Sequence, residues 1–334
     1  MNLLPTPEQH EIASAAAAFL AKELPPGSAA PDEQLWRQMG GLGWFTLAIR
    51  EQMGGTGYGI EEEMLLFREL GRVVASGPFL ATALASHVAA VSGDRALVEQ
   101  IASGSVRVGL AEPWRDTMSV VGPSVSGRFR VLDGAGASLL CVVDPRGAAL
   151  VDVSAAEGAG AARASFEPMD PGTTVELLTL PPVQARHFVP PSTAPIPAVG
   201  AILVTALLTG ICEATRDQSV GYVKEREQFG KPIGSFQAVK HRCADMAVRS
   251  EAAVSLSTYA TLAVRGGLPD GPQLLPLTKA LVSEYAVASA ADNIQNHGGM
   301  GFTAECTAHL YLKRANVLST VLGTPAQLWS ATLS

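Results

Sequence analysis

Runs of lysine or arginine are missing from this sequence, and so are closely spaced cysteines. The 334 residues carry 24 Lys and Arg against 31 Asp and Glu, and this net charge of −7 offers no footprint for nucleic acid or an anionic membrane. Cys141, Cys212, Cys243 and Cys306 form no C-x-x-C pair, which argues against a zinc site and a disulfide scaffold. Buried free thiols are therefore predicted.

A secretory leader and a membrane span are not indicated either. No basic residue precedes the first apolar residues, and Glu8 and Glu11 interrupt what would be the apolar core of a signal peptide. The uncharged segment 188–212 is the one stretch that resembles a span, but prolines break its first half. About 15 apolar residues remain, fewer than the roughly 20 that a spanning helix needs. We expect a buried bundle helix and a cytoplasmic protein.

The composition that is present, 47% hydrophobic and 16% charged residues, predicts a globular protein of two or three domains. Apolar residues recur at helical spacing up to about residue 107. Six short Val- and Leu-rich runs separated by turn residues follow, which favours an antiparallel barrel or sandwich. The predicted fold class is therefore α+β, with an N-terminal helical domain (1–107) and a middle antiparallel β domain (108–193).

Helical spacing returns after residue 193, and four long segments with short Gly or Pro connections predict an antiparallel four-helix bundle over residues 194–334. The four segments are 197–224, 235–264, 272–296 and 304–321.

Several common site chemistries lack their residues in this chain. The glycines at 54–59 do not follow a predicted strand, so they fail the context of a dinucleotide loop. A di-iron bundle needs two Glu-x-x-His pairs, and none occurs. His241 and His297 are predicted to be packed or solvated, and Glu112, Asp116 and Asp133 to cap turns or face solvent. No metal site is predicted.

The segment from Arg226 to Gln237, with the sequence REQFGKPIGSFQ, joins the first two predicted bundle helices. An arginine offers a planar fork of donors that suits a phosphate, and a Gly-Lys-Pro turn lets backbone approach a ligand closely. A surface arginine and lysine at a helix–helix turn are more often simply solvated. The segment alone therefore leaves anion binding and a solvated surface as alternatives.

This segment resembles the signature of the acyl-CoA dehydrogenase family, and the order of helices, β domain and bundle agrees with that family. Further matches are Gly54 to Gly57, Glu69 to Arg72 (ELGR), and Gln295 to Thr303 (QNHGGMGFT). The resemblance covers nearly the whole chain and is weakest in the middle.

The resemblance implies that the two bundle motifs serve an FAD bound by a neighbouring subunit. Arg226 would contact the pyrophosphate, Gln228 and Phe229 would line the adenosine side, and Gln237 would lie nearby. Gln295 and Gly299 would complete the adenine side, with glycines at 298 and 299 permitting close backbone approach.

The middle segment departs from the family pattern. Where the family carries Thr-Glu-Pro and a Gly-Ser/Thr pair that hydrogen-bonds the flavin ring, this chain has Ala111 before Glu112 and lacks the small-residue turn. Where the family carries Trp-Ile-Thr/Ser, this chain has Arg130 to Asp133, without an aromatic ring or hydroxyl.

The catalytic base of the family is also missing. Its usual Glu-Gly-Thr corresponds to Leu322-Gly323-Thr324, and the alternative position of the base falls at about Gly200. Neither leucine nor glycine has a side chain that can accept a proton. A general base contributes about 10²–10⁴-fold to the rate, so its absence at both positions argues against catalysis by this chain alone.

These features together predict a subunit that lends residues to FAD held by a homologous, catalytically complete partner. An α2β2 heterotetramer acting on an acyl-CoA is expected, and analogy with paired actinobacterial subunits favours a steroid side-chain CoA thioester. Two alternatives stay open. One is a flavin-free scaffold or regulatory protein, and the other is a self-sufficient homomeric dehydrogenase with a different base.

Overall fold

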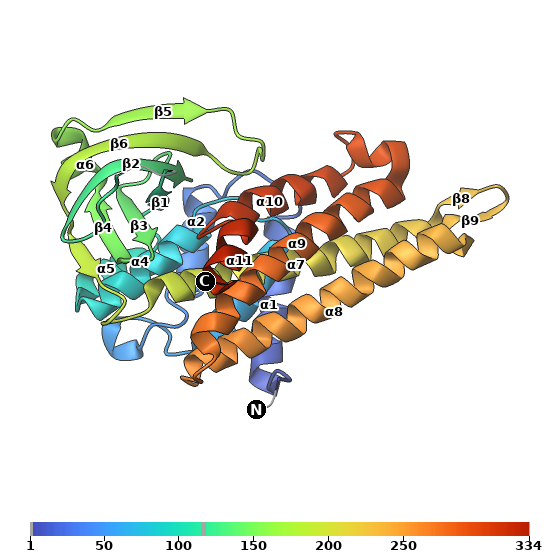
Figure 1. Ribbon diagram of the computed structural model, residues 1–334, viewed down its shortest axis with the longest axis horizontal. Coiled ribbons are helices and arrows are strands. Elements are labelled where there is room, and N and C mark those ends of the chain that lie inside the picture. Colours follow the sequence, from blue (N-terminus) through green and yellow to red (C-terminus); the bar gives the residue numbers. More distant parts are fainter. Residues whose placement is uncertain (1–2, 115–117, 334) are drawn as a thin grey trace. The chain divides into compact units, whose positions relative to one another are not determined.

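The computed structural model describes residues 3–114 and 118–333, and its first region is helical as predicted (Figure 1). Helix α1 begins with a capping box, in which the hydroxyl of Thr6 accepts from Gln9 N–H and the Gln9 side chain accepts from Thr6 N–H. The helices of this region are α1 (Pro7–Glu23), α2 (Glu33–Gly41), η1 (Glu51–Met53), α3 (Ile60–Arg72), α4 (Phe79–Val91) and α5 (Arg95–Ala102).

The middle region forms one sheet within the described residues, in the strand order β5-β6-β2-β1-β3-β4-β7. The prediction of a β domain is confirmed, but the sheet is mixed rather than wholly antiparallel, because β1 and β3 pair in parallel. The chain leaves β2, passes the end of β1 through residues 133–138, and enters β3 on the other side of β1. Left-handed backbone at Asp133 (φ 51°) and Gly136 (φ 70°) permits this turn. The strands are β1 (Val108–Pro113), β2 (Ser124–Leu132), β3 (Leu139–Asp144), β4 (Gly147–Asp152), β5 (Ala162–Phe166), β6 (Val175–Gln184) and β7 (His187–Val189), with helix α6 (Val153–Gly158) after β4.

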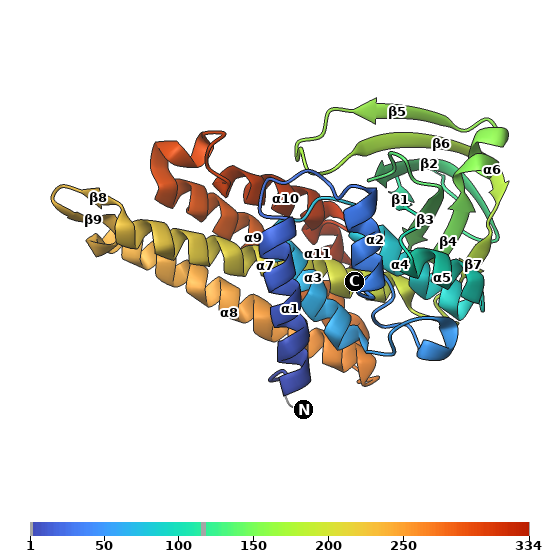
Figure 2. The same ribbon diagram turned by 180° about the vertical axis from the view of Figure 1, so that it is seen from behind.

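The four predicted bundle helices are confirmed within a few residues. They are α7 (Ile196–Glu225), α8 (Gln237–Arg265), α9 (Gly271–His297) and α10 (Ala308–Thr320), followed by α11 (Pro325–Leu333). Figures 1 and 2 both show α7, α8 and α9 lying alongside one another, with a hairpin made of β8 (Glu227–Gln228) and β9 (Lys231–Pro232) at one end. Among the described helices, α7 alone is long and apolar enough to cross a membrane. Because 72% of its apolar window is buried, it matches a core helix.

Helices α3 and α7 cross in backbone contact. A Cβ atom added to Gly71 would lie 2.1 Å from the carbonyl oxygen of Leu207, and one added to Gly210 would lie 2.0 Å from that of Arg68. Since real Cβ atoms essentially never come within 3.0 Å of such atoms, glycine is required at both positions.

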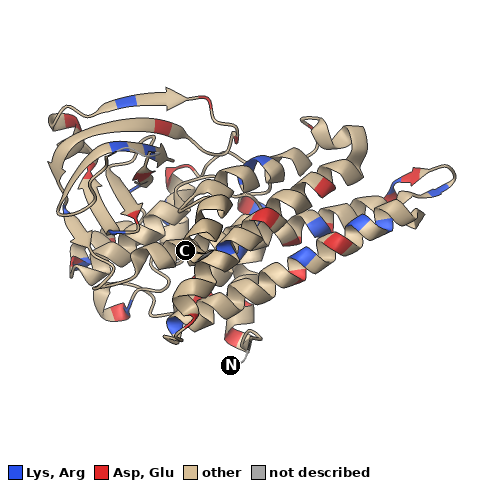
Figure 3. Cartoon of the chain, in the orientation of Figure 1, with Lys and Arg blue, Asp and Glu red and all other residues tan. Residues whose placement is uncertain are grey.

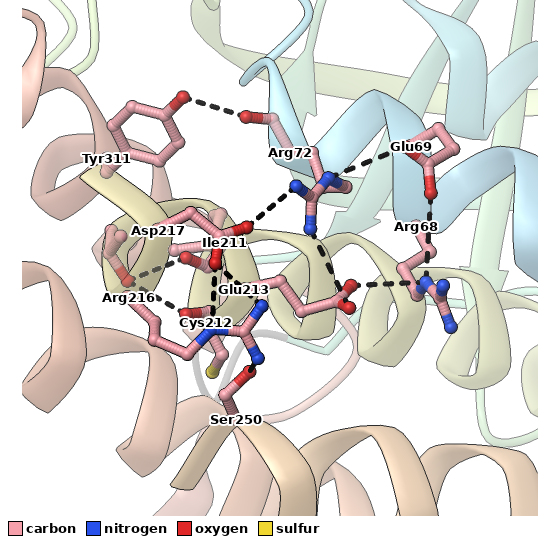
Figure 4. A network of polar contacts seen from close by, with 11 residues as sticks. Arg68, Glu69, Arg72, Ile211, Cys212, Glu213, Arg216, Asp217, Ser250 and Tyr311 are labelled. Carbon is pink, nitrogen blue, oxygen red and sulfur yellow. Dashed lines mark hydrogen bonds and ion pairs between the residues drawn. The ribbon is translucent and has the colours of Figure 1, made fainter. Parts of the chain in front are cut away.

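Ion pairs surround this crossing (Figure 4). Arg72 on α3 contacts Asp217 at 2.9 Å and Glu213 at 3.7 Å, while Arg68 contacts Glu213 at 3.1 Å. Burial raises the pKa of Glu69 above its usual value, although Arg72 and Arg68 beside it act in the opposite direction. The ELGR segment therefore has a packing role, which joins α3 to the bundle.

The described residues form two compact units. One contains the described residues of Met1–Ser28, Met64–Ala75 and Ala201–Ser334, and the other contains Ala29–Glu63 and Ser76–Gly200. The three-domain boundaries given above stay a prediction. Cys141 and Cys212 are buried free thiols whose pKa burial raises to about 12, whereas Cys243 and Cys306 are partly exposed.

Candidate functional site

The first candidate motif folds as a tight hairpin directly after α7. The Arg226 N–H donates to the Tyr222 carbonyl at 2.9 Å, and the Arg226 carbonyl accepts from Ile233 N–H at 2.8 Å, which closes the base of the hairpin. Strands β8 and β9 pair antiparallel on either side of a two-residue turn. Both turn residues, Phe229 (φ 54°) and Gly230 (φ 77°), adopt the left-handed backbone that such a turn requires.

Phe229 is an unusual residue for the tip of this hairpin. A non-glycine residue in left-handed backbone costs about 1–2 kcal/mol, and the Phe229 side chain is 90% exposed. Its ring meets the edge of Phe236 with centroids 6.0 Å apart, and the Lys231 ammonium lies 4.5 Å from the Phe236 centroid. Phe229 thus combines left-handed backbone with a large exposed ring.

The Arg226 side chain is exposed, and among the described residues its guanidinium has no hydrogen bond or ion pair. Glu225 and Glu227, on either side of Arg226 in the sequence, make no hydrogen bond or ion pair with its guanidinium in the described part of the chain. Figure 3 shows charges of both signs on the hairpin and the adjoining part of α8. Arg226 is therefore free to bind an anion.

The second candidate motif follows α9. Gln295 is exposed near the end of that helix, and Gly298 reverses the chain with φ 60°. A Cβ atom added to Gly299 would meet no atom within 4 Å, so this backbone is open to a ligand. Gly301 is different, because an added Cβ would lie 2.6 Å from the carbonyl oxygen of Ile294. Gly301 thus serves the packing of the loop onto α9.

The structure brings both motifs to the same end of the bundle. Tyr222, one turn before Arg226, stacks on His297, two residues after Gln295, with ring centroids 4.2 Å apart. His297 is a packed histidine, as predicted. The six predicted residues lie on the hairpin, at the start of α8 or at the end of α9 and its loop, and all six are exposed: Arg226, Gln228, Phe229, Gln237, Gln295 and Gly299.

Their chemistry fits one end of a dinucleotide. An unpaired guanidinium suits a diphosphate, an exposed ring and amide side chains suit a base and ribose, and the open glycine backbone allows close approach. The Gln228 amide donates to the Glu227 carbonyl at 2.8 Å, which leaves its side-chain oxygen available. Their individual roles stay predictions.

A cavity of about 370 Å³ near the hairpin was missed by the sequence reasoning. It is lined by Val220, Val223, Lys224, Pro232, Gly234, Lys240 and Cys243, and none of the six predicted residues lines it. Burial raises the pKa of Cys243, so its thiol is not activated. Only the valine spacing on α7 hinted at an apolar face here.

The described positions in β1 and β2 that correspond to the flavin-ring contacts of the family pattern carry other side chains. Ala111 is completely buried in β1 and carries no hydroxyl. Arg130 on β2 is paired with Glu112 at 2.6 Å. The expectation that Glu112 faces solvent or caps a turn is wrong, because β1 is covered on both faces and Glu112 is only 8% exposed.

Two other acidic residues named from the sequence have separate outcomes. Asp133 is partly exposed and accepts a hydrogen bond from Thr174 N–H at 3.0 Å; because these residues lie 41 apart in sequence, this bond joins two distant segments and does not cap a local turn. Asp116 lies outside the described residues.

The position expected for the base is apolar in the structure. Leu322 lies in the turn between α10 and α11 with a left-handed backbone (φ 55°). The buried ammonium of Lys279 donates to the Gly323 carbonyl at 2.7 Å and so holds this turn. Gly200, the second expected position, is buried in α7. Neither residue can accept a proton.

One buried titratable pair was not singled out from the sequence. The Glu63 side chain is fully buried and lies 2.8 Å from His87 Nε2. Burial acts to lower the pKa of His87, but the Glu63 carboxylate outweighs it and the net pKa is raised. Among the residues that the structure describes, no group of three or more His, Cys, Asp or Glu could hold a metal ion.

Comparison with known families gives two matches. Residues 6–104 match the family model "Acyl-CoA dehydrogenase, N-terminal domain", and residues 198–330 match "Acyl-CoA dehydrogenase, C-terminal domain".

Individual proteins agree with these matches. Acyl-CoA dehydrogenase FadE34 of Mycobacterium tuberculosis is 34% identical over 92% of this chain, which spans only 43% of FadE34. Acyl-CoA dehydrogenase IpdE2 of the same organism is 29% identical over 98% of this chain and 96% of IpdE2. The solved structure of the Tcur3481-Tcur3483 steroid ACAD variant is similar with a TM-score of 0.84 at 27% identity, over 97% of this chain and 96% of that one.

Proposed function

Because this chain belongs to the acyl-CoA dehydrogenase family, we propose that it is the base-lacking subunit of a heteromeric, FAD-dependent acyl-CoA dehydrogenase. Membership makes it an oxidoreductase that acts on acyl-CoA, with FAD as cofactor. The observation that carries the proposal is a contrast within one chain. Arg226 and Phe229 are exposed and ready to bind, whereas Leu322 and Ala111 cannot supply the chemistry.

In this proposal the bundle end holds the nucleotide part of FAD bound mainly by the partner subunit. Arg226 would donate charge-assisted hydrogen bonds to the pyrophosphate, each worth about 1.5–3 kcal/mol. Phe229 and Gln228 would line the adenosine, Gln237 would lie nearby, and the adenine would meet Gln295 and the backbone at Gly299.

The reaction needs a base that this chain lacks. FAD held in the complex would supply the hydride acceptor for the β-hydrogen of the acyl chain. The α-proton must leave to a carboxylate at the same time, and neither Leu322 nor Gly200 can accept it. The carboxylate therefore comes from the homologous partner subunit. The turn at Leu322, held by Lys279, presents an apolar side chain where an acid would otherwise lie.

Two similarities support a paired assembly and a bulky substrate. The Tcur3481-Tcur3483 protein is described as a steroid ACAD and is named for two components. The match to FadE34 takes 43% of that protein, which leaves space in one chain for a second unit of this size. We therefore propose an α2β2 heterotetramer in the cytoplasm that dehydrogenates the CoA thioester of a steroid side chain.

Co-expression with the neighbouring reading frame tests this proposal. The purified pair should be yellow, with about one FAD per heterodimer, and Arg226→Ala should release the flavin. Lys224→Ala is the matched control, because Lys224 is an exposed cation two residues earlier that should leave the flavin bound. Substantial acyl-CoA oxidation by this chain alone would contradict the proposal.

A flavin-free scaffold is the second candidate function. It is favoured by the pair between Arg130 and Glu112, which occupies the region where the family pattern places flavin contacts. A colourless homotetramer that binds no FAD with or without the co-expressed neighbour would establish it.

A further inference from the structure

We propose that the stacked rings of Tyr222 and His297 are a positioning pair. They set the distance between Arg226 and Gln295, the two residues proposed to bind the pyrophosphate and the adenine. This inference rests on the function proposed above and adds a role for two residues that touch neither phosphate nor base. The experiment below separates failure of the inference from failure of that function.

The stack links the two motifs at their bases. The rings lie 4.2 Å apart at an interplanar angle of 24°, one on the last turn of α7 and the other at the last residue of α9. The Tyr222 carbonyl accepts from the Arg226 N–H at 2.9 Å, so the tyrosine backbone fixes the start of the hairpin. Gln295 lies two residues before His297 on the same helix. Movement of either ring would therefore change the distance between the two donors.

His297 is itself held by a buried lock between α7 and α9. Its Nδ1 lies 2.8 Å from the carbonyl oxygen of Asn293, and because a carbonyl only accepts, Nδ1 carries the proton. The Asn293 side chain is completely buried, accepts from the Ser219 hydroxyl at 2.8 Å and donates to Gln218 at 2.9 Å. The histidine ring thus has a fixed orientation against which Tyr222 packs.

Other links between the two motifs are missing. Among the described residues, no hydrogen bond or ion pair joins the hairpin segment 226–237 to the segment 295–303. Arg242 does contact Asn296 at 3.1 Å, but it lies beyond the hairpin on α8. The hairpin is otherwise a two-stranded projection with exposed residues, and such a ribbon is only marginally ordered by itself. The stack therefore joins α7 to α9 at a point nearer to the hairpin than the hydrogen bonds of Asn293 do.

The test measures the dissociation constant of FAD for the co-purified pair of subunits, by flavin fluorescence, in a double-mutant cycle. Tyr222→Ala should weaken FAD binding about 10- to 100-fold, because one charge-assisted hydrogen bond from Arg226 is misplaced. Tyr222→Phe keeps the ring and should stay within about threefold of the unmodified protein. In the Arg226→Ala background, Tyr222→Ala should have little further effect, since the donor that it positions is gone.

The outcomes separate the possibilities. If Tyr222→Ala weakens FAD equally with and without Arg226, or if Tyr222→Phe is as harmful as Tyr222→Ala, the positioning role is wrong. If Arg226→Ala leaves FAD affinity unchanged, the proposed function of the hairpin fails, and the same cycle with Gln295→Ala then decides the positioning role. The urea midpoint of the flavin-free pair reports any general loss of packing separately.

Discussion

Replacing Gly210 by alanine tests the crossing of α3 and α7 most directly. The new methyl group would lie 2.0 Å from the Arg68 carbonyl oxygen, so the helices must separate by about 1 Å to reach the closest contact that Cβ atoms show. That separation would stretch the contacts of Glu213 with Arg68 and Arg72, now 3.1 and 3.7 Å. Overpacking costs about 1–3 kcal/mol, and breaking largely buried ion pairs adds to it. We expect the free energy of unfolding to fall by at least about 3 kcal/mol.

The same helix supplies the control for this experiment. Gly221 lies in α7, is exposed, and an added Cβ would meet no atom within 4 Å. Gly221→Ala should therefore stabilise the protein by about 0.5–1 kcal/mol through helix propensity alone. Urea unfolding followed by circular dichroism gives both values under one condition. A loss below about 1 kcal/mol for Gly210→Ala would refute the backbone contact between the two helices.

Three further predictions concern the hairpin, the sheet and the buried histidine. Phe229→Asn should stabilise the isolated chain by about 0.5–1 kcal/mol by relieving left-handed strain, yet weaken FAD binding by the assembled pair; unchanged FAD affinity would contradict a contact with the ring. Arg130→Met should destabilise by about 3 kcal/mol because it removes the cation that lies 2.6 Å from the buried Glu112 carboxylate, whereas Arg95→Met, which breaks an exposed pair with Glu99, should cost under about 1 kcal/mol in the same urea assay. The pKa of His87 in the folded protein is raised above 6.5, its ordinary value. Protonated His87 therefore contributes its full stability below pH 6.5, and this contribution is lost as the pH rises through the raised pKa of the folded protein. His87→Gln should make the urea midpoint fall less steeply as the pH rises from 6.5 through that pKa.

Helical periodicity predicted the bundle well because apolar residues at helical spacing form one face of each helix, and burial of that face against neighbouring helices stabilises the bundle. The ends of α7 and α9 agree with the predicted segments within one residue. Helix α11 was not predicted from the sequence. It is preceded by Thr324, which is joined to Gln327 by a local side-chain hydrogen bond, and it has no clear apolar pattern that would mark it.

The misplaced features depend on contacts between distant segments. The parallel pairing of β1 with β3 follows from the path of residues 133–138, and strand composition does not encode direction. The prediction for Glu112 was wrong because a charged residue in a short strand is expected on a solvated face of the sheet, whereas β1 is covered on both faces. The close approach at Gly71 and Gly210 was invisible for the same reason, since each glycine is explained only by the carbonyl of the other helix.

The candidate site was readable from the sequence because its residues are clustered in two short motifs and are exposed. What the structure adds is the cost of that exposure. Phe229 has left-handed backbone, which costs stability in the isolated chain, and its 90% exposed ring is left with the edge contact to Phe236, beside an unpaired Arg226. A scaffold protein would be more stable without a left-handed Phe229, whereas a subunit that binds FAD held by another chain needs both Phe229 and Arg226. The proposal of a shared FAD therefore accounts for the strained tip and for the apolar residue at Leu322 together, and it fixes the expected ratio at one flavin for each pair of chains.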